Sequence, residues 1–156
     1  MKVIFLDFNG VLDTSFKIDE INYDNLQRLK LICSSTGASV VISSSIKRSF
    51  IFTQVMSPLL RNLIDRLLSE GINVIGMTPN EETREEEIKK YLELHPEIDK
   101  FVVIDDDYDM DFGDSMIKLP SQSMDNQLGL DDYSMNKAIK VLGSVEKSVK
   151  LKKAHK

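Results

Sequence analysis

Five short apolar runs are spread along the chain, and each predicts a strand. The first four are 2–6, 38–42, 72–77 and 101–104, and 116–119 is a shorter fifth run. Runs of this length that are apolar almost throughout, rather than at every second position, are typical of strands buried on both faces. Such strands occur in parallel sheets that have helices on both sides. The pattern therefore favours an α/β protein.

The stretches between these runs carry apolar residues at helical spacing. The helix before the second strand is expected to end at Gly37, because glycine readily adopts the left-handed conformation of a C-terminal cap. From 50 to 68 the apolar residues come in pairs, which makes a wide helical stripe. Ser57 followed by Pro58 divides this stretch into two helices, since serine is a good N-terminal cap and proline is tolerated at the first helical position. Both helices are expected to cover the sheet.

The segment Thr78-Pro79-Asn80-Glu81 predicts the start of the next helix. It has the form of a capping box, with threonine as the cap and glutamate three residues later. The acidic segment that follows suits a helix N-terminus, but Arg84 does not, because a cation there opposes the helix dipole. Arg84 is therefore expected to have an anionic partner, and a neighbouring glutamate is one candidate.

A last helix is predicted after 129–132, so that strands and helices alternate along the whole chain. Regular alternation implies right-handed crossovers between parallel strands. The prediction is an α/β fold, a Rossmann-like doubly wound parallel sheet of about five strands with helices on both faces. Because we find no internal repeat and no interdomain linker, we expect a single domain over 1–145 and a basic, frayed C-terminal tail over 146–156.

Composition narrows the class of protein further. The chain has 156 residues, of which 42% are hydrophobic and 29% charged, as in a soluble globular protein. No apolar run is long enough to span a membrane and the N-terminal run is too short for a signal peptide, so the cytoplasm is the expected location. The single cysteine, Cys33, excludes an internal disulfide and a cysteine-based zinc cluster, and it is expected to pack in the core. The net charge of −5 argues against a broad nucleic-acid surface but permits a local phosphate site.

Polar clusters follow three of the predicted strands. Asp7 follows the first strand, 43–45 is a run of serines after the second, and Asp105 and Asp106 follow the fourth. Because the carboxyl ends of parallel strands meet at one edge of a sheet, where ligands of such sheets bind, we expect these side chains to gather there. For Asp7 taken alone, a solvated carboxylate at a strand end is the alternative.

Two of these clusters point to ligands. The serines, with Lys47 and Arg48 after them, precede a predicted helix whose first amides are unpaired, which is a natural site for a phosphate oxygen; a simple serine cap is the alternative. The acids 105–107, with further aspartates behind them, repel one another, and a hard divalent cation held by oxygen ligands would relieve this repulsion. An acidic surface loop is the alternative. We assign no role to His95.

Together these residues resemble the haloacid dehalogenase (HAD) superfamily. That superfamily opens with an apolar strand and Asp-x-Asp-Gly-Thr/Val, has Ser or Thr after its second strand, a later Lys or Arg, and an acidic pair after another strand. The corresponding residues here look like Asp7-Phe8-Asn9-Gly10-Val11, Ser43, Arg84 and Asp105-Asp106. The triple serine, Thr-Pro followed by Arg-x-x-x-Ile, and Ile-Asp-Asp-Asp-Tyr-Asp look, more narrowly, like a branch associated with RNA-repair proteins.

The resemblance implies a chemistry and a role for each of these side chains. Asp7 would attack phosphorus to form an aspartyl-phosphate, which water then hydrolyses, and an aspartate of ordinary pKa, about 3.9, is ionised at neutral pH. Ser43, with Ser44 in reserve and Lys47 nearby, would bind the phosphoryl group. Arg84 would neutralise charge that develops in the transition state.

The resemblance also implies Mg²⁺ as the cofactor. Its protein ligands would be Asp7, Asp105, Asp106 and the backbone carbonyl of Asn9, with Asp109 as a weaker candidate. Asn9 is where the chain departs from the phosphatases of the superfamily. Those enzymes have a second aspartate at this position, which protonates the leaving group and then activates water, and an amide can do neither.

Two functions therefore compete. The first is a Mg²⁺-dependent phosphohydrolase of a phosphomonoester. Few residues lie where the superfamily inserts its cap domains, so the site is expected to be uncovered, which suits a bulky substrate such as a nucleic-acid end or a phosphoprotein, or a partner that covers it. The second is a phosphate-binding or regulatory module that lacks turnover because of Asn9. We expect no membrane partner, and the sequence is silent on the oligomeric state.

Overall fold

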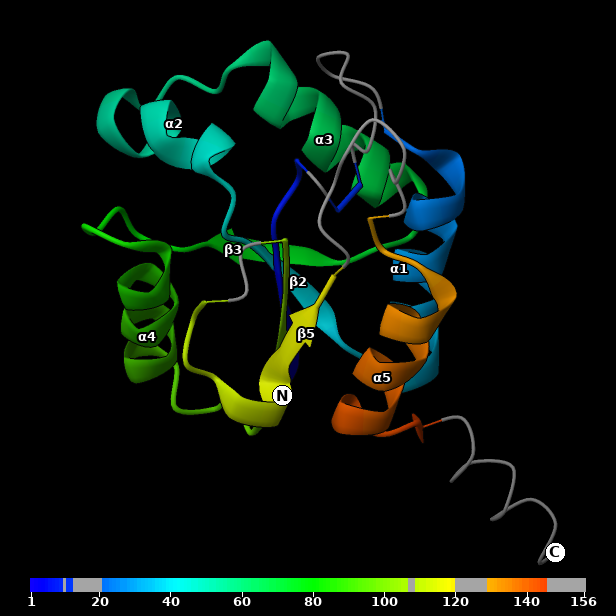
Figure 1. Cartoon of the computed structure of the whole chain (residues 1–156). Coiled ribbons are helices and arrows are strands. Elements are labelled where there is room, and N and C mark those ends of the chain that lie inside the picture. Colours follow the sequence, from blue (N-terminus) through cyan, green and yellow to red (C-terminus); the bar gives the residue numbers. More distant parts are fainter. Residues whose placement is uncertain (10, 13–20, 107–108, 120–128, 146–156) are drawn as a thin grey trace, which may run out of the picture.

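The computed structural model describes residues 1–9, 11–12, 21–106, 109–119 and 129–145. The C-terminal tail expected over 146–156 lies outside these residues, and so does Gly10 of the Asp7–Val11 motif. Figure 1 shows the arrangement of the elements. The strands are β1 (Lys2–Leu6), β2 (Ser39–Ile42), β3 (Val74–Met77), β4 (Lys100–Asp105) and β5 (Met116–Lys118). The helices are α1 (Tyr23–Thr36), α2 (Arg48–Thr53), α3 (Pro58–Ser69), α4 (Arg84–Leu94) and α5 (Asp132–Leu142), with short 3₁₀ turns η1 (Ser45–Lys47) and η2 (Gly113–Ser115).

The five strands form one parallel sheet in the order β3-β2-β1-β4-β5. From β1 the chain adds β2 and then β3 on one side, and it then returns to add β4 and β5 on the other side of β1. The strand order therefore reverses between β1 and β4, and ligands of doubly wound sheets bind at the carboxyl ends of the strands at such a point. The predicted doubly wound α/β fold is confirmed.

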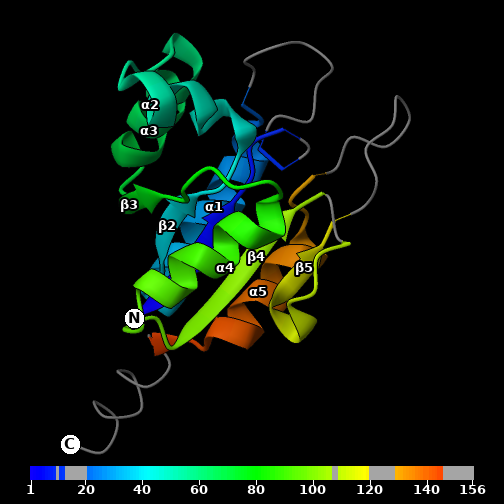
Figure 2. The same ribbon diagram turned by 90° about the vertical axis from the view of Figure 1, so that its left-hand side faces the viewer.

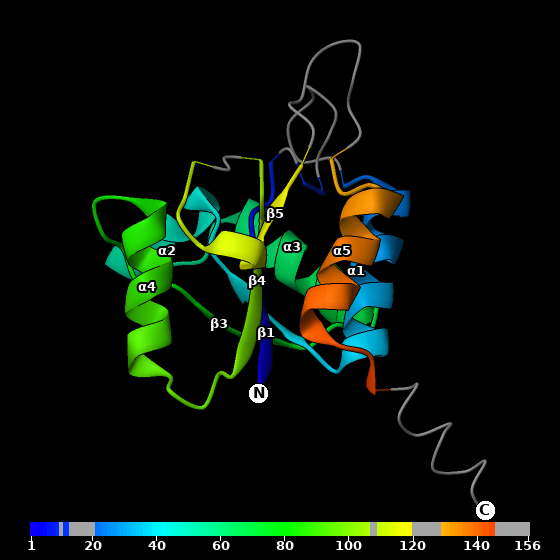
Figure 3. The ribbon, with the colours of Figure 1, turned by 60° about the horizontal axis from the view of Figure 1, so that its bottom comes forward.

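Successive residues of each strand face opposite sides of the sheet, and both sides of the central strand β1 are buried. Ile4 and Leu6 of β1 lie in a large core with α1, α3 and α5, whereas Val3 and Phe5 lie in a smaller core beneath α4. Figures 2 and 3 show the result, with α4 alone on one face and α1, α3 and α5 on the other. The expectation that strands are buried on both faces is thus confirmed for β1, β2 and β4, whereas Ile75 of the edge strand β3 is exposed.

Most of the expected helix boundaries are confirmed by their caps. Gly37 ends α1 in a left-handed conformation with φ of 77°, and its N–H donates to the carbonyl of Cys33. Ser57 caps α3 by accepting a hydrogen bond from the amide of Leu60 at 3.2 Å, with Pro58 at the first position. The division of 50–68 into two helices is therefore correct.

The predicted start of the fourth helix is wrong. Thr78 is still part of the sheet, because its N–H donates to the carbonyl of Ile42 at 3.0 Å. The helix begins at Arg84, and its cap is Thr83, whose hydroxyl accepts from the amide of Glu86 at 3.1 Å. Pairing with β2 therefore outweighs the local capping signal, and a second threonine–glutamate pair five residues later forms the cap.

Candidate active site

Hydrogen bonds of the sheet continue one residue beyond three of the strands, and this fixes the polar residues that follow. The N–H groups of Asp7, Ser43 and Thr78 donate to carbonyls of the adjacent strands at 3.1, 3.0 and 3.0 Å. Asp105 is the last residue of β4 and lies in register with Lys118. The carboxyl edge of the sheet therefore carries a row of polar side chains on rigid backbone.

Alternation along the strands places the two buried aspartates of this row on the same face. Asp7 is two residues after Phe5, and Asp105 is two residues after Val103, and both of these apolar residues pack in the core beneath α4. The first residue of α4, Arg84, lies over the same edge. The N-terminal end of α4 and the ends of β1 and β4 together form the site.

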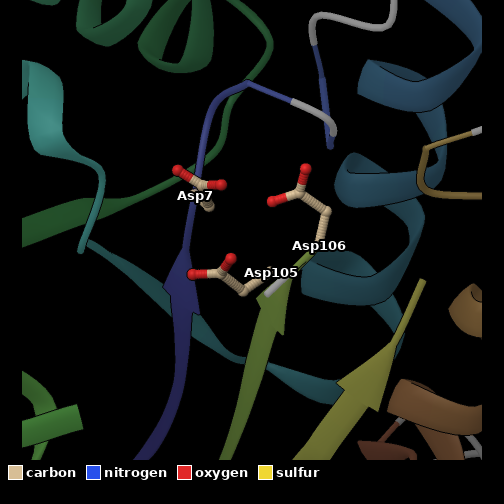
Figure 4. Close-up of side chains that lie close together, drawn as sticks. All are labelled: Asp7, Asp105 and Asp106. Atoms are coloured by element: carbon tan, nitrogen blue, oxygen red, sulfur yellow. The ribbon is translucent and has the colours of Figure 1, made fainter. Parts of the chain in front are cut away.

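Three carboxylates converge at this point, as Figure 4 shows. One oxygen from each of Asp7, Asp105 and Asp106 lies within 4.8 Å of the others. Asp7 is 4% exposed and Asp105 fully buried, while Asp106 is half-buried. Three carboxylate oxygens this close together could hold a hard divalent cation such as Mg²⁺. The expected gathering of these acids at one sheet edge is confirmed.

Arg84 provides the positive charge next to this cluster. Its Nη1 donates to Oδ2 of Asp105 at 2.7 Å and lies 3.5 Å from Oδ2 of Asp7. Burial works against the charge on Arg84, but the two aspartates outweigh burial and raise its pKa. The expected anionic partner is therefore found at the ends of β1 and β4 rather than among the neighbouring glutamates.

The protonation state of Asp7 differs from the expectation. Burial, reinforced by the charge of Asp105, raises its pKa to about 8, and Arg84 offsets only part of this rise. Without a bound cation the Asp7 carboxyl therefore keeps its proton to a higher pH than an ordinary aspartate does. The ordinary value fails because it assumes a solvated side chain, whereas here a second carboxylate lies alongside in a poorly hydrated site.

Two buried hydroxyls in the row have no hydrogen-bond partner among the described residues: the Oγ of Ser43 and the Oγ1 of Thr78. A buried hydroxyl without a partner is costly, and a ligand oxygen is one group that relieves this cost. Ser44 has a structural task, because its hydroxyl accepts from the amide of Ile46 and caps η1. Ser43 is thus free to bind a ligand, and Thr78 is a polar residue of the edge that the sequence pattern assigned to a helix cap.

Lys47 forms hydrogen bonds with residues outside the carboxylate cluster. Its ammonium is fully buried and donates to Oε2 of Glu87 and to Oδ1 of Asn80, each at 3.1 Å. Burial lowers its pKa, and Glu87 counteracts this change. In the structure, the ammonium of Lys47 therefore belongs to a buried ion pair with Glu87. A direct contact between Lys47 and phosphate stays a prediction.

The remaining candidates lie around the site. Asn9 is exposed, two residues beyond Asp7. Asp109 belongs to a small open cavity of about 280 Å³ that Arg84 also lines, and it is not one of the three clustered carboxylates. Away from the site, His95 stacks on Tyr91 at 4.1 Å between ring centroids.

Cys33 is a structural residue. It is half-buried against the larger core, and burial raises the pKa of its thiol to about 12. A thiol with so high a pKa is protonated and unreactive at neutral pH. The expectation that Cys33 packs in the core is confirmed.

A doubly wound sheet that gathers three carboxylates, an arginine and a free hydroxyl at its carboxyl edge is the arrangement that the resemblance to the HAD superfamily implies. Over residues 3–134, the chain matches the family described as the HAD domain in Swiss Army Knife RNA repair proteins, and it belongs to that family. The comparisons with curated proteins and with solved structures find no match. Among the helices of the described ranges, none has the length and apolar character needed to cross a membrane.

Proposed function

We propose that this protein is a Mg²⁺-dependent phosphohydrolase that acts through an aspartyl-phosphate on Asp7. The observation that carries the proposal is the convergence of Asp7, Asp105 and Asp106 with Arg84 beside them and the unpartnered hydroxyl of Ser43 one strand away. Membership of the HAD family supports hydrolase chemistry in general. The positions of these side chains support the individual role that we propose for each of them.

The donor set fits Mg²⁺. The three carboxylates supply hard oxygen atoms, and burial together with the charge of Asp105 raises the pKa of Asp7, a rise that Arg84 only partly offsets. Asp7, Asp105 and Asp106 would hold the ion, and the backbone carbonyl of Asn9 is the fourth proposed ligand. When bound, the ion supplies positive charge that keeps Asp7 ionised and shields it from an anionic phosphoryl group.

The reaction requires two displacements at phosphorus. In the first, a carboxylate oxygen of Asp7 forms a bond to phosphorus, and the bond from phosphorus to the leaving-group oxygen breaks. Arg84, which lies 3.5 Å from Asp7, neutralises charge on the phosphoryl oxygens, and Ser43 donates a hydrogen bond to one of them. In the second, water attacks phosphorus and releases phosphate and the Asp7 carboxylate. Asn9 cannot donate the proton that the leaving oxygen needs, so in this chain that proton comes from solvent.

The proposed substrate is a phosphomonoester on a large molecule. Only residues 7–22 separate β1 from α1, and only 78–83 separate β3 from α4, so neither connection has room for a cap domain. A site without a cap can accept a bulky substrate, and the family name points to RNA repair. A phosphorylated nucleic-acid end is therefore the substrate that we propose, with a phosphoprotein as the alternative and the cytoplasm as the proposed location.

The experiment that tests the proposal is turnover of phosphorylated RNA and DNA ends and of an aryl phosphate, with and without MgCl₂. The wild-type protein should be slow and Asn9→Asp faster, because a positioned general acid–base typically contributes on the order of 10²–10⁴-fold. Asp7→Asn in the Asn9→Asp background should abolish turnover. Magnesium-dependent activity that survives the loss of Asp7 would refute the proposed nucleophile.

Asn9 itself favours a second candidate function, a phosphate-binding or regulatory module. The metal site and the Ser43–Arg84 anion site would be the same, but no turnover would occur. Binding of tungstate, a phosphate analogue, with Mg²⁺ and without turnover even in Asn9→Asp would support this alternative. Turnover that rises in Asn9→Asp would exclude it.

A further inference from the structure

Glu87 is a fully buried carboxylate outside the proposed catalytic group. Its side chain is 2% exposed, and its Oε2 accepts from the ammonium of Lys47 at 3.1 Å and from the amide of Glu81 at 3.2 Å. The guanidinium of Arg48 lies 3.5 Å from the same oxygen. One carboxylate oxygen therefore joins α4 to two separate loops, the one after β2 and the one after β3.

Asn80 closes this network. Its Oδ1 accepts from the ammonium of Lys47 at 3.1 Å, and its Nδ2 donates to the backbone carbonyl of Arg48 at 3.3 Å. The loop after β2 begins at Ser43, and the loop after β3 leads into Arg84. The network thus connects the two segments that carry the proposed phosphoryl contacts.

Glu87 is also coupled to Arg84 within α4. Residues three apart lie on the same side of a helix, so Glu87 is one turn beyond Arg84 on the side that faces the sheet edge. The negative charge of Glu87 favours the charged form of Arg84 and contributes to its raised pKa. Fixing Glu87 therefore fixes the turn of α4 that presents Arg84 to Asp7 and Asp105.

A purely stabilising role does not explain this arrangement well. Replacing a buried ion pair by apolar side chains of similar size is often neutral or stabilising, so a buried pair is weak evidence for a contribution to stability. A charged pair with fixed hydrogen-bond geometry specifies position in a way that apolar contacts do not.

We propose that Glu87, through its buried ion pair with Lys47, is a positioning residue that holds Arg84 against Asp7 and Asp105. The catalytic meaning of this role rests on the proposed function. The placement of Arg84 itself does not, and it can be measured in the protein without substrate.

The experiment records the ¹⁵N–¹H signals of the Arg84 guanidinium by NMR in metal-free protein, assigned by their loss in Arg84→Ala. The test variant is Lys47→Met/Glu87→Leu, which removes both charges and keeps the space filled. Glu86→Gln is the matched control, because Glu86 is an exposed acid one residue away in the same helix turn. Far-ultraviolet circular dichroism and thermal unfolding establish that each variant folds. Glu87→Asp, which keeps the charge but shortens its reach, replaces the double variant if that variant does not fold.

We expect the Arg84 signals to be sharp in the wild type and in Glu86→Gln. In the folded test variant they should change chemical shift, or disappear because the guanidinium protons exchange with water. As a second readout, Arg84→Ala should weaken tungstate binding in MgCl₂ by about tenfold in the wild type, as loss of a charge-assisted hydrogen bond predicts, and by less than about threefold in the test variant. Unchanged Arg84 signals in the folded test variant would overturn the positioning role.

The two proposals fail in different ways. If the wild type neither binds tungstate nor turns over any phosphomonoester, the proposed function fails, while the NMR comparison still decides the role of Glu87. If Asn9→Asp turns over substrate and the test variant in that background keeps the same kcat and KM, the proposed function stands and the positioning role fails.

Discussion

The raised pKa of Asp7 predicts that the metal-free protein loses stability as the pH rises from 5 to 7. In the unfolded chain this carboxyl has a pKa near 3.8, and in the folded protein the value is about 8. Between these two values the folded state retains a proton that the unfolded state has released. The stabilisation is therefore fully present below about pH 4, and it is lost progressively as the pH approaches 8.

The size of the effect follows from the proton count. One proton held only by the folded state changes the free energy of unfolding by about 1.4 kcal/mol for each pH unit, or about 3 kcal/mol between pH 5 and 7. For a chain of this size, 3 kcal/mol corresponds to a fall in Tm of roughly 6–12 °C. Asp7 is almost fully buried, so screening by solvent does not greatly reduce this figure.

The assay is thermal unfolding in chelator-treated buffer at pH 5, 6 and 7, for the wild type and for Asp7→Asn. Other groups titrate in both proteins, so the informative quantity is the difference between the two pH dependences. Asparagine has the same shape and carries no proton in this range. The variant should therefore lack the downward slope that Asp7 contributes, and it should be the more stable protein at pH 7.

Magnesium should reverse the effect, because it binds the ionised carboxylate and competes with the proton. At a hundredfold excess over its dissociation constant, Mg²⁺ should add about 2.7 kcal/mol, and its apparent affinity should increase from pH 6 to 7. Equal pH dependence in the wild type and in Asp7→Asn would refute the raised pKa. A magnesium-induced shift in Tm that is unchanged in Asp105→Asn would refute the metal site.

Three further substitutions test individual parts of the structure. Ser43→Ala should leave the Tm of the ligand-free protein unchanged or raise it, because the substitution removes a buried hydroxyl without a partner. The same substitution should weaken tungstate binding by about tenfold, and equal affinities in calorimetry would argue against the anion site. Thr78→Val should stabilise the ligand-free protein by about 1 kcal/mol in denaturant unfolding for the same reason, and a loss of stability would reveal a partner for that hydroxyl. Thr83→Ala should cost about 1 kcal/mol by removing the cap of α4, whereas Thr83→Ser should cost much less, and equal losses would contradict the cap.

The fold was largely predictable because the central strands of its sheet are buried on both faces. Continuous apolar runs such as 101–104 leave little choice of structure, and the polar residue after each run marks where the strand ends. The start of α4 was not predictable from local signals. The amide of Thr78 finds its partner in Ile42, far away in the chain, and this pairing decides against the capping box.

The gathering of Asp7, Asp105 and Asp106 at one sheet edge was predictable, but the electrostatic state of the site was not. The sequence left open whether Arg84 pairs with a nearby glutamate. In the folded protein its hydrogen-bond partner is Asp105, 21 residues away. The partner of Lys47 is Glu87, 40 residues away, and no spacing pattern points to it. Burial and proximity set the pKa values, and both come from tertiary structure.

The exposed position of Asn9 makes Asn9→Asp an informative substitution for this protein. Asp7 and Asp105 are buried, so replacing either one changes the metal site and the stability together. Asn9 is exposed, and a charge added at an exposed position usually changes the free energy of unfolding by no more than about 0.5 kcal/mol. The backbone carbonyl that we propose as a metal ligand is retained. We therefore expect Asn9→Asp to leave the Tm and the Mg²⁺ affinity close to those of the wild type while it raises turnover by on the order of 10²–10⁴-fold. A rise in turnover accompanied by a large change in Mg²⁺ affinity would assign the gain to the metal site rather than to a restored general acid.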